Sequence, residues 1–155
     1  MKKTFTKIYT EDGQQYKITA EVRFDDECKN GHKTFAITGE ILRKAKNGRW
    51  VFDCCGQIQD DIAKHFPDLV PFFKWHLCST DGPLHYLANT LYHASDKDHW
   101  GRRKEKEPDI EAARKTAIWP DATLEQLQDE EQLKARLPGL LAEFRAAVES
   151  LGFEW

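Results

Sequence analysis

Hydrophobic and polar side chains alternate through the first fifty residues, which is the pattern of strands with one buried face. The clearest run puts Tyr16, Ile18, Ala20, Val22 and Phe24 on one face, with polar and charged residues between them. Shorter runs of the same kind lie on both sides of it. We therefore expect four antiparallel strands in meander order over about 4–53.

Turn sequences separate these runs. Glu11-Asp12-Gly13 predicts a tight hairpin, and Asn47-Gly48 predicts a second one with a type I′ turn. Gly39 interrupts the alternation of the third run, where we expect either a bulge or close packing against another element.

After Cys55 the apolar residues recur every three or four positions, which is typical of helices. Pro71 is expected to open one helix, and Thr123 with Gln126 has the spacing of a capping box. Pro138-Gly139 is expected to interrupt the last helix. Residues 101–109, GRRKEKEPD, predict an exposed charged loop.

The fold class that follows is α+β, with an N-terminal four-stranded antiparallel meander sheet covered by C-terminal helices. A chain of 155 residues is the size of one domain, so we expect a single domain over 1–155 with its helical part over about 57–152. The sequence has no apolar run that could span a membrane and no secretory signal, so we expect the protein in the cytoplasm of its host cell.

The charge distribution limits the partners to be expected. The net charge is −3, without the basic excess of a duplex-DNA binder, so no direct duplex DNA binding is expected. Residues 121–155 hold eight acidic and three basic side chains, and Asp129, Glu130 and Glu131 are candidates for binding a basic partner. Trp100, beside Arg102, Arg103 and Lys104, is the candidate for stacking on single-stranded nucleic acid, and a solvated loop explains the segment equally well.

Residues 74–101 hold most of the reactive side chains, including four of the six histidines. Imidazoles and thiolates are the preferred ligands of zinc, and a closed site needs four. The candidate ligands are His76, Cys78 and His85, with Cys55 or His93 as the fourth. No standard zinc signature is present.

Two further clusters admit a simpler interpretation. Cys28 and His32 have a four-residue spacing that a metal clip could use, but they also suit an ordinary loop. The segment 78–83, CSTDGP, contains nucleophile and acid types, yet we interpret it as a capped turn. The four cysteines are expected to be reduced thiols.

Residues 75–92, WHLCSTDGPLHYLANTLY, resemble the shared core WHLxSTDGPxHYxANTxY of small proteins encoded by bacteriophages and prophages. The resemblance extends over about 4–100. It implies that His76, Asp81, His85 and Asn89 belong to one shared site. Relatives carry a Cys-x-His pair where this chain has Gln57 and Gln59, which removes two potential ligands.

The function expected from this resemblance is that of a phage-encoded, host-directed inhibitor. We expect an anti-CRISPR protein that binds a CRISPR effector, a host protein, and blocks its nucleic-acid step rather than an enzyme. Its candidate binding residues are Asp81, Asn89, Asp129, Glu130 and Glu131. The alternative is a metal-dependent enzyme acting on a nucleotide or phosphoester, with zinc as the cofactor. A third possibility is a phage structural or regulatory protein.

Overall fold

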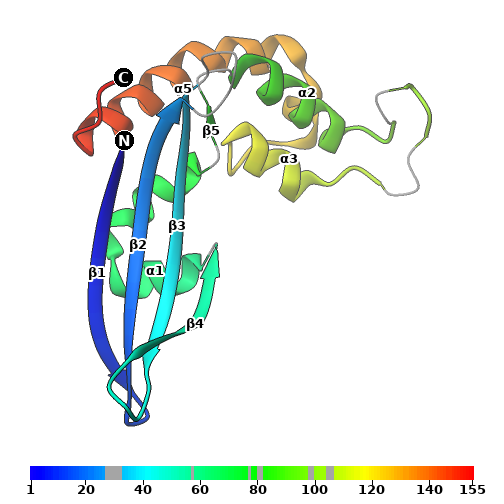
Figure 1. Cartoon of the computed structure of the whole chain (residues 1–155). Coiled ribbons are helices and arrows are strands. Elements are labelled where there is room, and N and C mark those ends of the chain that lie inside the picture. Colours follow the sequence, from blue (N-terminus) through cyan, green and yellow to red (C-terminus); the bar gives the residue numbers. More distant parts are fainter. Residues whose placement is uncertain (27–32, 57, 77, 80–81, 98–99, 104–106) are drawn as a thin grey trace. The chain divides into compact units, whose positions relative to one another are not determined.

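The structure is a computed structural model of the chain that describes residues 1–26, 33–56, 58–76, 78–79, 82–97, 100–103 and 107–155 (Figure 1). These residues form two compact units. The first consists of Met1–Ser79 and Leu151–Glu154, and the second consists of Thr80–Ser150 and Trp155.

The first unit contains five strands and two short helical segments. Its elements are β1 (Lys2–Glu11), β2 (Gln14–Asp26), β3 (Lys33–Lys44), β4 (Trp50–Gly56), α1 (Gln59–His65), the 3-10 helix η1 (Pro67–Trp75) and β5 (Cys78–Ser79). The second unit contains α2 (Gly82–Ala94), α3 (Ile110–Ala117), α4 (Leu124–Gln128) and α5 (Glu130–Ser150).

The sheet has the strand order β1-β2-β3-β4, and each pair is antiparallel (Figure 1). The predicted α+β class with a four-stranded antiparallel meander is therefore confirmed. The sequence pattern does not predict the short strand β5. β5 pairs with Thr34 and Phe35 of β3. It lies on the same side of β3 as β4, which pairs with residues 39–44.

The two hairpin turns differ from each other. At the β1–β2 turn, Asp12 and Gly13 both have positive φ (49° and 78°), as a type I′ turn requires. At the β3–β4 turn only Gly48 has positive φ (81°), and the Asn47 side chain accepts a hydrogen bond from the Arg49 amide at 3.0 Å. The expected type I′ turn at Asn47-Gly48 is therefore wrong, because the loop is one residue longer than a two-residue turn.

One face of the sheet is packed against α1. Ile18, Val22 and Ile37 on this face have no exposed surface. Gly39 lies opposite α1 so closely that a Cβ atom there would be 2.6 Å from Cγ1 of Ile58. Close packing, and not a bulge at this position, explains the glycine. The bulge in β3–β4 pairing lies farther along, between Ile41 and Leu42 of β3.

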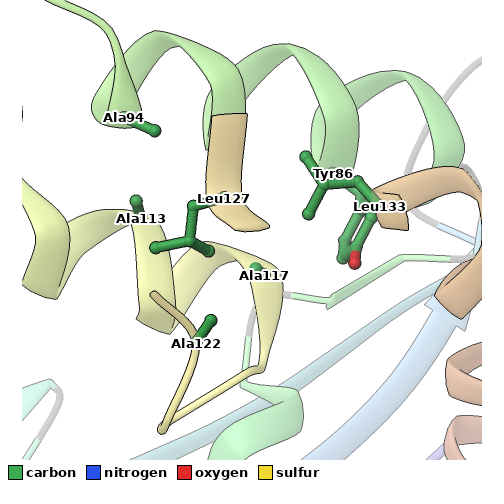
Figure 2. Close-up of a cluster of buried hydrophobic side chains, with 7 residues drawn as sticks. All are labelled: Tyr86, Ala94, Ala113, Ala117, Ala122, Leu127 and Leu133. Carbon is green, nitrogen blue, oxygen red and sulfur yellow. The ribbon is translucent and has the colours of Figure 1, made fainter. Parts of the chain in front are cut away.

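The second unit is built around small side chains. Figure 2 shows Leu127 of α4 beside the alanines of α3 and Leu133 of α5 beside Tyr86 of α2, and the small alanine side chains let the helices approach closely. The buried cluster consists of Tyr86, Ala94, Ala113, Ala117, Ala122, Leu127 and Leu133.

Two details of the helical unit bear on the sequence predictions. The capping box is confirmed, since Thr123 accepts from the amide of Gln126 and the Gln126 side chain accepts from the amide of Thr123. The predicted interruption at Pro138-Gly139 is wrong, because α5 continues through both residues. In the same way Pro71 lies inside η1 and does not open a helix.

Candidate functional site

His76, the first residue of the predicted zinc set, closes a gap in the edge of the sheet. Between the segments of β3 that pair with β4 and β5, the amide of Ile37 donates a hydrogen bond to Nδ1 of His76 at 3.0 Å. The imidazole thus takes the place of a strand carbonyl at this point of the ladder. This contact gives His76 a role in the fold.

The same hydrogen bond sets the tautomer of His76. A neutral imidazole has one lone pair available for accepting, and here Nδ1 uses it, so the proton lies on Nε2. Zinc binds to an imidazole lone pair. Zinc binding by His76 would therefore require the ring to give up its bond to Ile37.

The adjacent cysteines at the end of β4 lie on opposite faces of the sheet. Cys54 pairs with Ile41 and so lies on the face toward α1, whereas Cys55 pairs with Glu40 and is exposed on the other face. Burial, followed by the nearby Asp53 and Asp61 carboxylates, raises the pKa of the Cys54 thiol. A raised pKa keeps this cysteine protonated and weakly nucleophilic at neutral pH.

The other residues of the central motif are described only in part. Cys78 pairs with Phe35 through β5, and His85 lies in the first half of α2, but the side chains of 77–85 are outside the described part of the chain. Asp81 is outside the described residues, as are Cys28 and His32. Asn89 is exposed on α2.

Of the predicted metal set, the structure describes the side chains of His76 and Cys55, whereas those of Cys78 and His85 lie outside the described part of the chain. Within the described ranges, no group of three or more histidine, cysteine or acidic side chains is placed to hold a metal ion. Zinc binding by His76, Cys78, His85 and Cys55 stays a prediction.

The acidic residues at the start of α5 are engaged within their own helix. Asp129 accepts hydrogen bonds from the amides of Glu131 (3.1 Å) and Gln132 (3.2 Å), so it acts as the N-terminal cap. Glu130 pairs with Lys134 at 3.1 Å and raises the pKa of that lysine by hydrogen bonding and charge. Of the three acids, Glu131 is the most available to a partner, with 86% of its side chain exposed.

Under the sheet, α1 is held to β1 by aromatic stacking. The Tyr9 ring stacks on His65 with 4.1 Å between centroids and on Tyr16 with 5.3 Å. Burial, together with the charges of Lys7 and Lys64, lowers the pKa of His65, which favours its neutral form. This cluster fixes α1, and the ring nitrogens of His65 have no hydrogen-bonded acid or nucleophile among the contacts that the structure describes.

The sheet face opposite α1 carries a surface that the sequence pattern did not reveal. The register places Ile8, Lys17, Leu42 and Phe52 in one row across the four strands, and α1 leaves this face open. Phe52 is 60% exposed and Ile8 is 54% exposed. Two lysines flank the half-buried ring of Trp50, which lies one row farther toward the β3–β4 turn.

The geometry around Trp50 combines an aromatic ring with cations. Nζ of Lys17 lies 4.9 Å from the ring centroid, and Nζ of Lys44 lies 5.9 Å from it. Lys46 and Arg49 are exposed on the adjoining turn. We name this region the hairpin surface and define it by Lys17, Leu42, Lys44, Lys46, Arg49, Trp50 and Phe52.

The sequence did contain a signal for the hairpin surface. Residues 43–52, RKAKNGRWVF, hold four basic and two aromatic side chains and no acidic one. The turn at Asn47-Gly48 and the strand after it account for the segment structurally, so the charge pattern alone does not identify a binding surface.

Comparison of the sequence with protein-family models, curated proteins and solved structures finds no match. The resemblance of the central motif to phage-encoded proteins therefore stays a prediction. Among the described residues, no helix is long and apolar enough to cross a membrane.

Proposed function

We propose that this protein is a host-directed inhibitor that binds a CRISPR effector and blocks its nucleic-acid step, and that it does so through the open face of its sheet. The resemblance of residues 75–92 to phage-encoded proteins supports the host-directed part of this proposal. The exposed row on the open face, ending in Ile8 and Phe52, supports binding as the mode of action.

Exposed apolar side chains that gather on one face favour association with a partner. Removing apolar surface from water contributes roughly 25 cal/mol for each Å² buried, and contiguous apolar patches mark interaction sites on monomeric proteins. Phe52 and Leu42 are neighbours in one row, and Ile8 follows beyond Lys17, so a partner laid across the strands would cover the three apolar side chains together with Lys17. Phe52, an exposed aromatic, is the expected centre of the contact.

The central motif, residues 75–92, contributes to the sheet through His76. The His76 ring accepts the hydrogen bond of the Ile37 amide between β4 and β5, and so completes the edge of the sheet whose open face we propose as the binding surface. Order at a binding surface lowers the conformational entropy lost on association.

The test is inhibition of target cleavage by a panel of purified CRISPR effectors, with wild-type protein and the Phe52→Ser variant. We expect Phe52→Ser to weaken inhibition at least tenfold. Val70→Ser is the matched control, because Val70 is a 43% exposed apolar residue of η1. If no effector is inhibited, or if both variants inhibit like wild type, the proposal is rejected.

The alternative, a metal-dependent enzyme, is tested separately by elemental analysis of untagged protein together with a thiol titration. Stoichiometric zinc released by His85→Ala would favour that alternative. Protein that carries no metal and accepts none would exclude it.

A further inference from the structure

We infer that the hairpin surface binds single-stranded nucleic acid, with bases stacked on Phe52 and Trp50 and phosphates held by the surrounding lysines and Arg49. This inference rests on the proposed function in one respect, since it takes the same open face as the binding surface, but its ligand is a nucleic acid and not the effector protein. It also stands on observations of its own.

The first observation is the spacing of the two rings. Trp50 and Phe52 are two positions apart on β4 and pair with Lys44 and Leu42, so both lie on the open face. Two residues of a strand span about 6.6 Å. Aromatic side chains presented in this way on a sheet can stack on successive bases of a single strand.

The second observation is the state of the cations. Among the described residues, Lys44, Lys46 and Arg49 form no ion pair. At the other end of the same face Lys2 and Arg23 both pair with Glu21, so that carboxylate offsets part of their charge. The cations that form no ion pair therefore lie around the half-buried ring of Trp50, beside the exposed Phe52, and the carboxylate of Glu40 lies on the same face one row farther along β3.

These two observations together favour a single strand over the other acidic partners. A duplex hides the faces of its bases, so the rings would have nothing to stack on, and the lysines alone would provide weak binding. An acidic peptide would match the lysines but offers no planar groups at regular intervals. A single strand repeats a flat base and a phosphate in every nucleotide.

The experiment is a fluorescence anisotropy titration of labelled 15-mers of dT and rU, with a 15-base-pair duplex for comparison. We expect the single strands to bind and the duplex to bind at least tenfold more weakly. Phe52→Ala should weaken binding of the single strands about tenfold, because one ring is no longer there to stack on a base. The double variant Lys44→Glu/Lys46→Glu should also lower the slope of log K against log salt by roughly 1.4, or about 0.7 for each phosphate that is no longer neutralised.

Two control variants separate this surface from the rest of the chain. Trp100 is 77% exposed and lies beside Arg102 and Arg103, so Trp100→Ala tests the other place where an aromatic residue adjoins basic ones. Lys64→Glu reverses an exposed lysine on α1, away from the open face. Both should bind like wild type. Circular dichroism checks that each variant is folded, and Phe52→Ala removes only an exposed side chain.

Every outcome distinguishes the inference from the proposed function. Binding of oligonucleotides without inhibition of any effector would support the inference and reject the proposed function. Inhibition through Phe52 without oligonucleotide binding would overturn the inference and identify an acidic protein surface as the partner. Loss of binding in Trp100→Ala, with Phe52→Ala unchanged, would also overturn it, as would equal affinity for the duplex.

Discussion

The contact between Gly39 and α1 gives the sharpest test of the packing in the sheet unit. A Cβ atom at residue 39 would lie 2.6 Å from Cγ1 and 2.8 Å from Cδ1 of Ile58, and 3.0 Å from Cδ1 of Ile62. Carbon atoms at their preferred separation are about 3.5–4.0 Å apart. Gly39→Ala must therefore displace α1 or force Ile58 into another rotamer.

The size of the effect follows from two opposing contributions. Inserting a methyl group into a packed core typically costs about 1–3 kcal/mol. Replacing glycine within a strand returns roughly 0.5–1 kcal/mol, because alanine loses less backbone entropy on folding. We expect a net loss of about 1.5 kcal/mol in the free energy of unfolding, which corresponds to a fall of roughly 3–6 °C in Tm for a chain of this size.

The assay is thermal and urea unfolding of four variants beside wild type: Gly39→Ala, Ile58→Ala, the double variant of these two, and Gly139→Ala. Gly139→Ala is the matched control, since a Cβ atom there meets nothing within 4 Å and the residue lies inside α5, so this variant should be stabilised by about 0.5–1 kcal/mol. In the double variant Gly39→Ala/Ile58→Ala the clash with Ile58 is removed. The two substitutions should then cost at least about 1 kcal/mol less together than the sum of their separate costs.

Two results would contradict the expected close packing. One is Gly39→Ala being as stable as wild type or more so, which would mean that α1 is not held against β3. The other is simple additivity in the double variant, which would mean that the cost of the alanine does not arise at Ile58.

Three further predictions concern single side chains. Thr90→Val should leave the free energy of unfolding unchanged or raise it by up to about 1 kcal/mol, because the buried hydroxyl has no hydrogen-bond partner among the described residues; a loss above about 1 kcal/mol would refute this. The pKa of His65 is lowered in the folded state, so the unfolded chain binds a proton more readily and the free energy of unfolding should fall as pH drops below about 6.5. In denaturant titrations between about pH 5 and 7.5, His65→Phe should make the free energy of unfolding depend less on pH. Asp129→Ala should lower the free energy of unfolding by about 1 kcal/mol because a helix cap is lost, whereas Glu131→Lys should change it by no more than about 0.5 kcal/mol. Glu131→Lys is therefore the variant that tests binding of a basic partner without a loss of stability. Equal stabilities of the two variants would refute the capping role of Asp129.

Much of the sheet was predictable because its pattern has a physical basis that is local. The alternation from Tyr16 to Phe24 requires only that one face be buried, and the structure buries Ile18, Ala20, Val22 and Phe24. The capping box at Thr123 likewise depends on residues three positions apart. Such features need no knowledge of the rest of the chain.

The errors arise where tertiary contacts override local preference. The sequence predicts a helix break at Pro138, but α5 continues because Leu133 and Phe144, on either side, are both buried. The change from strands to helices near residue 57 is not where the two compact units divide, since α1 and η1 belong with the sheet and the second unit begins after Ser79. The single domain over 1–155 stays a prediction. The helical period of residues 58–66 could not show which partner they pack against.

The candidate site was less accessible to sequence reasoning than the fold. The spacing of His76 and Cys78 suggests a ligand set, yet the role of His76 depends on the amide of Ile37, thirty-nine residues away. Only the strand register shows that this amide falls in the gap between β4 and β5. A histidine that completes a sheet edge has the same sequence signature as one that binds zinc.

Net charge is a poor guide to the hairpin surface for a related reason. A total of −3 disfavours a nucleic-acid partner, but charges act over a Debye length of about 8 Å at physiological ionic strength. At that range a phosphate beside Phe52 is affected by Lys17, Lys44, Lys46 and Arg49 of the hairpin surface, and by the carboxylates of Asp53, next in the chain, and Glu40, one row farther along the same face. The eight acidic residues of 121–155 lower the total without lowering the potential at Trp50, unless they lie within a Debye length of it. The local density of charge around an exposed aromatic ring, and not the sum over the chain, is therefore the quantity that predicts a surface for single strands.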